Sequence, residues 1–454
     1  MKNVIIRDEY KIKIERTCEM TLSEELMWRG FLNQTTFSNI TELDKEIRTF
    51  YFGMDPSAES LTIGNLAPLM MVRHFIDHGY KAILLFGGAT GRIGDPDGKA
   101  EERKVKAIEE VDRNVKMQTK QVKDLFAGKE FITVNNYDWF KDINYIDFLR
   151  EVGKNFSMTQ LLDRKFVKDR IGEGGSGISY AEFSYNLMQG YDFLYLFRKY
   201  GVTLQVCGAD QWGNCITGVE LIKKLEKATV DVYSVPLIID KVSGRKFGKS
   251  EGNAVWLDPN LTSVFKYYQF WLNADDIAVE DYLKIYTLIT KEELDELMEK
   301  AAKAAKIIET YDQEKVDRLI RAVAWSVANK KTFLELVDMG IAESGLGDPI
   351  SRQNKRFKIR GVLRDALRAK SVGIIEELPE KGIVKYAKPV GIIGALIPTT
   401  NPDLTPAGQA VYGIKARDVI IFSPHPRSKK TTFETVRLMR EALEREGAPA
   451  DYNV

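Results

Sequence analysis

The chain has 454 residues and a formal net charge of +1, with 44% hydrophobic and 29% charged residues. Such a length and composition suit two or three globular domains and exclude a disordered chain. The near-zero net charge also excludes a basic field over the whole protein, so an RNA partner would have to bind a local patch.

Cysteine and histidine are scarce. Cys18, Cys207 and Cys215 fit neither a paired disulfide framework nor a CxxC zinc spacing, and His74 and His78 lack the HExxH pattern. We therefore expect no protein metal site and a reducing compartment. The charged N-terminus does not resemble a signal peptide and no run approaches ~20 apolar residues, so we expect a cytoplasmic protein without a membrane segment.

Strands and helices are predicted to alternate in the first part of the chain. Residues 1–19 form a charged extension, and a first helix is expected to begin with Ser23 as its N-cap. Strands are then predicted at 49–57, 82–88, 131–136, 203–208 and 236–240, and helices at 66–78, 104–126, 158–168, 180–199 and 211–226. This order predicts an α/β fold with a parallel sheet that helices cover on both faces.

The pattern changes after about Asp258. Residues 262–370 are almost wholly helical in pattern, and strand character returns at 382–398. A helix at 404–414, a strand at 419–422 and a helix at 429–446 complete the chain. So few strands predict a truncated α/β segment after the helical region.

The glycine-rich segment 88–99 contains neither a dinucleotide fingerprint nor a P-loop. Glycines at 87, 88, 91 and 94 would let the backbone approach a ligand, although a tight turn is the commoner role of such a loop. The segment alone therefore predicts no particular ligand.

The segment 61–65 opens a predicted helix, with Asn65 as a candidate N-cap and Pro68 in the first turn. A helix N-terminus that follows a glycine can bind phosphate, because free N–H groups and the helix dipole both favour an anion. A capped helix without a ligand is the alternative.

A basic loop at 244–253 interleaves Arg245, Lys246 and Lys249 with glycine and serine. A mobile loop of this kind can close on a triphosphate and neutralise charge that develops on pyrophosphate. A solvated basic turn is the alternative.

Tyr185, Gln189 and Asp192 occur at i, i+4 and i+7 of one predicted helix, which places them on one face. A phenol, an amide and a carboxylate in this register can converge on a small polar ligand. A wet helix surface would show the same pattern.

Taken together, the motifs ELMWRGFLNQTT, YFGMDPSAESLTIGN, FGGATGRIGDPDGK, EFSYNLMQGYDFLYL, LQVCGADQWGN and KFGKSEGNAVWLD resemble the tyrosyl-tRNA synthetase family over roughly residues 20–290. The resemblance implies a class I synthetase fold: a nucleotide-binding parallel sheet with a helical insertion that forms a homodimer interface. It also implies L-tyrosine, ATP with Mg²⁺ and tRNA(Tyr) as substrates and partners, with no tightly bound cofactor.

The same resemblance implies roles for individual residues. It implies a tyrosine pocket made by Tyr51, Asp95, Tyr185, Gln189 and Asp192. It implies an ATP site made by Gly53, Asp55, Gly64, Gly208, Asp210, Gln211 and Lys249. It implies catalytic positions at Thr62, Asn65, Lys246, Lys249 and Ser250.

This sequence departs from the family pattern in two respects. The two histidines of the first signature are Thr62 and Asn65 here, and the shorter donor of Thr62 predicts slow adenylation. From about residue 300 the usual RNA-binding regions are replaced by a segment that resembles the N-terminal part of a coenzyme-A-acylating aldehyde dehydrogenase. In that family Asn401 would lie by the substrate oxygen and Ser423–Lys430 along the cofactor, but no cysteine nucleophile is present there, so we expect no dehydrogenase activity.

The sequence thus predicts a chimera with an N-terminal extension at 1–19, a catalytic domain at 20–260, a helical junction at 261–299 and a dehydrogenase-like fragment at 300–454. The favoured function is that of an ATP-dependent tyrosine–tRNA ligase. The alternative is a catalytically impaired module that still binds tyrosine or RNA.

Overall fold

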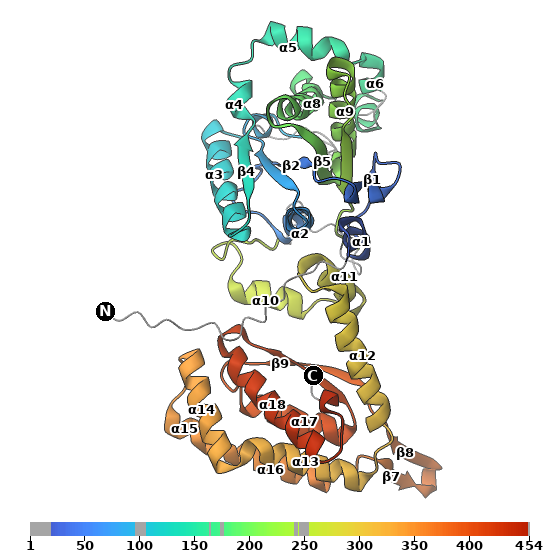
Figure 1. The fold of residues 1–454 in the computed structure, drawn as a ribbon, viewed down its shortest axis with the longest axis vertical. Coiled ribbons are helices and arrows are strands. Elements are labelled where there is room, and N and C mark those ends of the chain that lie inside the picture. The colour runs from blue at the N-terminus through green and yellow to red at the C-terminus, as the bar shows by residue number, and fades with distance from the viewer. Residues whose placement is uncertain are drawn as a thin grey trace, which may run out of the picture. The chain divides into compact units, whose positions relative to one another are not determined.

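The computed structural model describes residues 20–95, 106–162, 165–172, 177–239, 244 and 254–452 (Figure 1). Contacts divide the chain into two units, unit 1 (Met1–Ile289) and unit 2 (Thr290–Val454). The boundaries predicted at 260/261 and 299/300 stay predictions. In the part of the chain that is described, no helix is long and apolar enough to cross a membrane.

Unit 1 is an α/β fold, as predicted. Its helices are α1 Leu22–Trp28, α2 Ile63–Asp77, α3 Ile108–Leu125, α4 Tyr137–Phe140, α5 Tyr145–Glu151, α6 Met158–Leu162, α7 Lys165–Ile171, α8 Tyr180–Tyr200, α9 Trp212–Glu226, α10 Val264–Leu272 and α11 Asp276–Tyr286. Its strands are β1 Gln34–Thr35, β2 Thr49–Met54, β3 Lys81–Phe86, β4 Phe131–Asn135, β5 Val202–Gly208 and β6 Asp231–Val235.

The six strands form one sheet in the order β1-β6-β5-β2-β3-β4. All neighbours are parallel except β1, which runs antiparallel to β6. Strand β2 therefore lies between β3, which follows it in the sequence, and β5, which comes much later. The order of the strands reverses between β2 and β5, and such a switch point is where open parallel sheets bind ligands, at the carboxyl ends of the strands.

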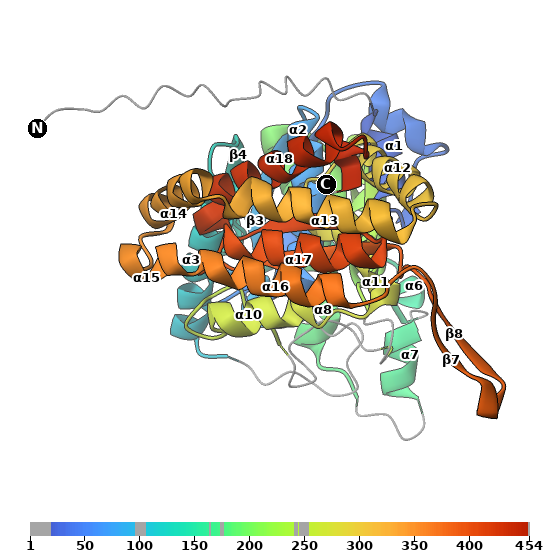
Figure 2. The same cartoon turned by 90° about the horizontal axis from the view of Figure 1, so that it is seen from below.

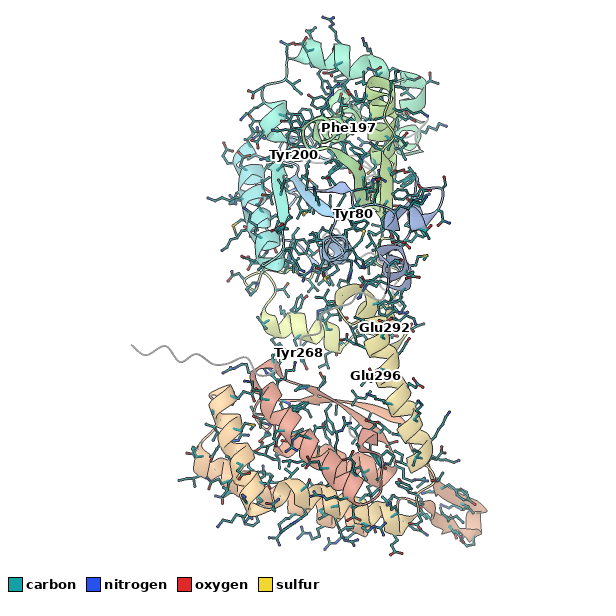
Figure 3. The ribbon with its side chains drawn as sticks, viewed as in Figure 1. Tyr80, Phe197, Tyr200, Tyr268, Glu292 and Glu296 are labelled. Atoms are coloured by element: carbon teal, nitrogen blue, oxygen red, sulfur yellow. The ribbon has the colours of Figure 1, made fainter. Side chains whose placement is uncertain are left out.

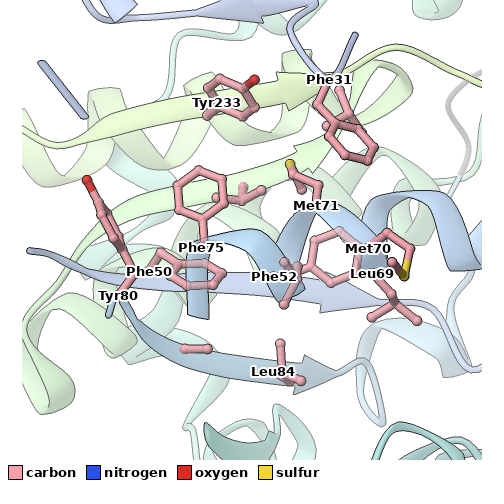
Figure 4. Packing of buried hydrophobic residues seen from close by; sticks show 14 of the residues in the cluster. Phe31, Phe50, Phe52, Leu69, Met70, Met71, Phe75, Tyr80, Leu84 and Tyr233 are labelled. Carbon is pink, nitrogen blue, oxygen red and sulfur yellow. The ribbon is translucent and has the colours of Figure 1, made fainter. Parts of the chain in front are cut away.

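Side chains alternate across the sheet, and two separate cores result. Phe50 and Phe52 of β2 pack with α2 on one face, in the cluster shown in Figure 4. Tyr51 points to the opposite face, into the core that α8 and α9 cover. On the first face Tyr80 is buried, and its hydroxyl donates to the Leu43 carbonyl at 2.5 Å (Figure 3).

Three predicted elements of unit 1 have other bounds. The N-cap of α1 is Thr21, whose hydroxyl accepts from the Glu24 N–H, whereas the Ser23 hydroxyl donates to Asp44. The strand expected at 236–240 was placed wrongly: the strand is β6, at Asp231–Val235, and it ends before Pro236, which has no N–H with which to continue the ladder. The helix expected at 158–168 covers α6 and the first part of α7, and residues 163 and 164 between these two helices lie outside the described residues.

Helix α2 also differs from its prediction. It begins at Ile63 with Thr62 as its N-cap, so Asn65 is the third helical residue rather than the cap. Pro68 consequently lies inside the helix and not in its first turn. Gly79 follows the helix with a φ of +87°, a conformation that favours glycine.

Unit 2 is mostly helical and has a small parallel sheet. Its helices are α12 Lys291–Ile308, α13 Gln313–Ala328, α14 Lys330–Ser344, α15 Pro349–Asn354, α16 Arg356–Arg368, α17 Leu404–Ala416 and α18 Lys429–Arg445. Its strands are β7 Gly373–Leu378, β8 Ile383–Ala387, β9 Ile392–Ile397 and β10 Val419–Pro424. β9 and β10 pair in parallel and share one core with the helices, whereas β7 and β8 form an antiparallel hairpin.

The strand character predicted at 382–398 is therefore two strands, β8 and β9, in different sheets. Pro389 and Gly391, which has a φ of +119°, separate them. Strand β7 had no counterpart in the prediction.

A buried ion cluster joins the first two helices of unit 1. The Glu25 carboxylate accepts from Arg29 at 2.9 Å and lies 3.1 Å from Nδ1 of His74, which is 2% exposed. Burial alone would raise the pKa of Glu25, but the hydrogen bond and charge of His74 and the nearby Arg29 lower it to about 2. The ionised carboxylate therefore stabilises the fold.

We expect the Glu25→Gln variant to lose on the order of 2 kcal/mol of unfolding free energy at pH 7, allowing for solvent screening. Because the folded-state pKa lies below the ordinary 4.5, the stabilisation is present above pH 4.5 and is lost as the pH falls toward about 2. Urea unfolding at several pH values measures this. Glu59→Gln, at an exposed carboxylate, is the control, and a difference from wild type that does not shrink below pH 4.5 would contradict the assignment.

Candidate active site

The carboxyl ends of β2 and β5 bring together four residues of the predicted ATP site. Phe52 pairs with Val206 across the switch point, so Gly53 at the end of β2 and Asp55 just after it lie beside Gly208 at the end of β5 and Asp210 just after it. The side chain of Asp210 is exposed at this edge. A ligand at this edge would meet both strand ends at once.

Tyr51 lies just below this edge, and only 1% of it is exposed. Among the described residues its hydroxyl has no hydrogen-bond partner. Burial raises the pKa of Tyr51 well above its ordinary value, and the nearby Cys215 and Asp192 raise it further, so the phenol is neutral. A buried hydroxyl without a partner costs free energy, and a bound polar group would relieve that cost.

Helix α8 supplies further side chains near the Tyr51 hydroxyl. Ser179 caps its start by accepting from the Glu182 N–H, and Gly201 ends it with a φ of +66°. Between these ends Tyr185 and Asp192 are 7% and 2% exposed and contribute to the electrostatic environment of the Tyr51 hydroxyl.

Asp192 is held by two donors that the sequence did not single out. Asn136 donates from Nδ2 to Oδ2 at 3.1 Å, and Trp139 donates from Nε1 to Oδ1 at 2.9 Å. Burial raises the pKa of Asp192 to about 7, against the two hydrogen bonds, which lower it. The carboxylate is thus fixed in orientation and readily gains or loses a proton near neutral pH.

Asn136 and Trp139 lie immediately after β4, at the carboxyl end of a third parallel strand. Their position after a predicted strand was a usable signal, because the strand ends of a parallel sheet meet at one edge. An asparagine and a tryptophan carry no recognisable motif, however, and nothing local shows that they reach a residue 53 or 56 positions away.

A second group of polar side chains links the predicted tyrosine site to the predicted ATP site. Gln211 donates to Oδ2 of Asp95 at 2.6 Å, and Asn214 donates to the side-chain oxygen Oε1 of Gln211 at 3.2 Å. Gln189 approaches Sγ of Cys215 at 3.9 Å, while its own oxygen is buried without a partner among the described residues. Two buried acceptors, Asp95 and the Gln189 oxygen, can therefore receive a cationic donor.

The glycines of the 87–91 loop serve close packing within the protein. A Cβ at Gly88 would lie 2.1 Å from the Asn135 amide oxygen, and one at Gly91 would lie 2.7 Å from Pro56. The backbone of this loop therefore packs closely against side chains of the protein itself. This is the tight turn expected as the alternative to a ligand site.

The N-terminus of α2 is closed by its own side chains. Oδ1 of Asn65 accepts from both the Thr62 N–H and the Thr62 hydroxyl, each at 3.0 Å. Gly64 lies in the same turn and is half-buried. The Thr62 hydroxyl, which is 3% exposed, is thus engaged inside the protein rather than directed outward.

A distant segment is attached to this helix start by the backbone. The Ile63 N–H donates to the Val255 carbonyl at 3.0 Å, the Leu257 N–H donates to the Leu61 carbonyl at 2.8 Å, and Thr62 pairs with Trp256. Lys246, Lys249 and Ser250 lie outside the described residues. The segment that follows them is held against the N-terminus of α2.

Among the described residues no three His, Cys, Asp or Glu side chains converge as a metal site would require. The polar groups at the sheet edge are instead distributed around Tyr51, Asp192 and Asp95. They suit an organic ligand with a hydroxyl at one end and an amine at the other.

Comparison with known proteins identifies the relatives of the chain. Residues 43–332 match the family described as tRNA synthetases class I (W and Y). The chain is 42% identical over 323 residues to tyrosine–tRNA ligase 2 of Bacillus cereus, which covers 70% of this chain and 75% of the relative. It is 39% identical over 408 residues to tyrosine–tRNA ligase of Flavobacterium johnsoniae, covering 81% and 94%.

Solved structures show two further similarities. A C-terminally truncated mitochondrial tyrosyl-tRNA synthetase of Aspergillus nidulans matches with a TM-score of 0.56 and 29% identity, over 65% of this chain and 87% of that one. An acetylating aldehyde dehydrogenase of Geobacillus thermoglucosidasius matches with a TM-score of 0.33 and 35% identity, over 35% of each chain.

Proposed function

Because this chain belongs to the class I tRNA synthetases (W and Y), we propose that it is a tyrosine–tRNA ligase, which activates L-tyrosine with ATP and transfers it to tRNA(Tyr). The observation that carries this proposal is a pair of buried groups: the Tyr51 hydroxyl, which has no partner among the described residues, and the oriented Asp192 carboxylate. A phenol hydroxyl can donate to Asp192 and accept from Tyr51. An indole N–H only donates, so tryptophan would leave the Tyr51 hydroxyl without an acceptor.

The remaining polar groups suit the other end of the amino acid. The ammonium group can donate to Asp95 and to the Gln189 oxygen, and we assign the buried Tyr185 to the same group. Gln211, which donates to Asp95, positions that carboxylate from the second strand end. We therefore assign tyrosine recognition to the five residues predicted from the resemblance.

ATP is placed at the switch point, along Gly53, Asp55, Gly64, Gly208, Asp210 and Gln211. The carboxylate of tyrosine would attack the α-phosphorus, forming a C–O–P bond to adenylate as the bond to pyrophosphate breaks. No protein nucleophile takes part, so positioning and charge neutralisation carry the rate. Mg²⁺ would accompany the triphosphate, and Lys246, Lys249 and Ser250 would neutralise the leaving pyrophosphate.

Tyrosine-dependent exchange of pyrophosphate into ATP tests the proposal directly. Exchange is expected with tyrosine and not with tryptophan or phenylalanine, because only tyrosine satisfies both Tyr51 and Asp192. Tyrosine binding in calorimetry without any exchange would instead support the alternative, an impaired binding module. Absence of both tyrosine binding and pyrophosphate exchange would contradict the proposal.

The affinity for tyrosine is expected to depend on pH. Since Asp192 has a pKa of about 7, its carboxyl group must lose a proton at lower pH before it can accept from the phenol. We expect the Kd for tyrosine to be roughly tenfold higher at pH 6 than at pH 8. Calorimetry across this range measures it, and a constant Kd would contradict the role of the ionised carboxylate.

Thr62 is expected to limit adenylation, because its hydroxyl donates to Asn65 and is not available to phosphate. In the Thr62→His variant a longer donor can reach the triphosphate, and we expect exchange to rise at least tenfold, toward the ~10²–10³-fold that one such donor contributes elsewhere. Thr62→Ala is the control, since it removes the hydroxyl without adding a donor. Equal rates in the two variants would rule out a limit at this position.

We also propose a homodimer in the cytoplasm, where tRNA and ATP are available. Apolar side chains are exposed on the edge strand β4 and on α5, at Ile132, Tyr145 and Ile146, which are 49%, 59% and 60% exposed. Sedimentation of the wild type and of Ile146→Glu tests the interface. A monomeric wild type at micromolar concentration would contradict it.

A further inference from the structure

Helix α16 (Arg356–Arg368) of unit 2 carries a row of arginines. Arg356, Arg360, Arg364 and Arg368 recur at every fourth residue and share one face. With a rise of about 1.5 Å per residue the row extends over roughly 18 Å. Arg360, Arg364 and Arg368 are exposed, and Arg356 is half-buried.

Positive charge is concentrated around this helix. Residues 349–370 contain eight Lys or Arg side chains and a single acid, Asp365, in a protein whose net charge is only +1. Of the eight, Arg352 is buried against Asp403, so seven remain at or near the surface. A local field of this kind differs from the alternating charges of an ordinary solvated helix.

The arginines are largely without acidic partners. Asp365 lies 3.7 Å from Arg364 and 3.9 Å from Arg368, at the limit of an ion pair. In the described part of the chain, no carboxylate lies within ion-pair distance of Arg356, Lys358 or Arg360. The described residues therefore do not neutralise these three cations.

Phe357 orients two of the guanidinium groups. Its ring is 51% exposed, and the Arg356 and Arg360 guanidinium carbons lie 4.9 and 5.8 Å from its centre. Such contacts hold a guanidinium group at the surface without consuming its charge. The row is thus partly ordered before any ligand binds.

The other face of α16 is buried. Ile359 and Ala366 are 1% and 3% exposed within the core of unit 2, where α16 runs beside α13 and α17 (Figure 2). A basic helix that enters a lipid surface needs an exposed apolar face, whereas the apolar face of α16 is buried. An extended polyanion is the partner that fits such an anchored basic row.

We propose that the basic face of α16, defined by Arg356, Arg360, Arg364 and Arg368, binds the phosphate backbone of RNA. The identity of that RNA as tRNA rests on the proposed function. Contacts to phosphate carry no sequence information, so this face supplies affinity and not anticodon recognition. Arginine suits the role because its planar guanidinium group forms bidentate hydrogen bonds with phosphate.

Fluorescence anisotropy with labelled tRNA transcripts, one carrying a tyrosine anticodon and one unrelated, tests the proposal on the full chain. In Arg356→Gln/Arg360→Gln/Arg364→Gln we expect at least tenfold weaker binding of both RNAs at 50 mM salt. The slope of log K against log salt should become shallower by roughly 2 to 3. The variant with Lys at the same three positions keeps the charge and is expected to bind within a few-fold of wild type.

The matched control is Lys300→Gln/Lys303→Gln/Lys306→Gln, which removes three cations from α12 of the same unit. Equal losses in the two Gln variants, or no loss in the α16 variant, would overturn the proposal. Binding to anionic phospholipid vesicles that depends on α16, without RNA binding, would overturn it in favour of a membrane. Pyrophosphate exchange does not require tRNA. A failure of exchange would therefore contradict the proposed function, whereas the RNA affinity of the α16 variants would still test this inference.

Discussion

Replacing Asp192 by asparagine is expected to lower kcat/KM for tyrosine activation by roughly 10²–10³-fold. Asn136 and Trp139 both donate to the Asp192 carboxylate, and a phenol would be a third donor. An asparagine has a single acceptor oxygen, so one buried donor must face its NH₂ group. Loss of such a charge-assisted contact costs about 2.7–4 kcal/mol, which corresponds to the rate factor given.

Pyrophosphate exchange at varied tyrosine concentration measures the effect, with Asp147→Asn on the exposed surface of α5 as the control. Unfolding would not explain the loss. The pKa of Asp192 is raised from 3.8 to about 7, so its ionisation lowers the stability of the folded state as the pH rises through that window. Above pH 7 the Asp192→Asn variant should therefore be no less stable than wild type, and full activity in it would remove Asp192 from the pocket.

The second large effect concerns stability. Arg352 and Asp403 are each 2% exposed and form an ion pair at 2.8 Å, which joins α15 to the start of α17. Arg352→Met leaves the Asp403 carboxylate buried and unpaired. We expect a loss of about 3–5 kcal/mol, which would lower the melting temperature of unit 2 by roughly 6–20 °C.

The double variant Arg352→Met/Asp403→Leu removes both charges. It distinguishes the loss of the ion pair from the cost of leaving one buried charge unpaired. It should recover most of the loss, because apolar replacement of a whole buried ion pair is often neutral or stabilising. Arg445→Met, at an exposed position of α18, is the control. A double variant as unstable as the single one would show that packing of the Arg352 side chain carries the effect, with its stem against Gly347 and its guanidinium group against Gly340.

Spacing within one helix was sufficient to predict a shared face for three of the candidate residues. The i, i+4, i+7 pattern of Tyr185, Gln189 and Asp192 placed these residues on one face, and α8 turns that face toward Tyr51. The α/β fold was also predictable, because alternating strands and helices admit few topologies.

The sequence could not predict which side chains from different helices and strands contact one another. Trp139 reaches Asp192 only because the segment that follows β4 meets the middle of α8 in space. Local errors had local causes: Pro236 ends β6, and Thr62 displaces Asn65 as the N-cap of α2 because its hydroxyl can reach the Asn65 side chain.

The backbone pairing between Leu61–Ile63 and Val255–Leu257 has a consequence for how this protein can evolve. Two segments about 190 positions apart share one small ladder, so neither can change shape alone. A substitution at Thr62 should therefore change the effect of substitutions near Trp256, and beneficial changes at the two places should arise in pairs. Libraries that vary both segments together would be expected to contain improved variants that neither single library holds.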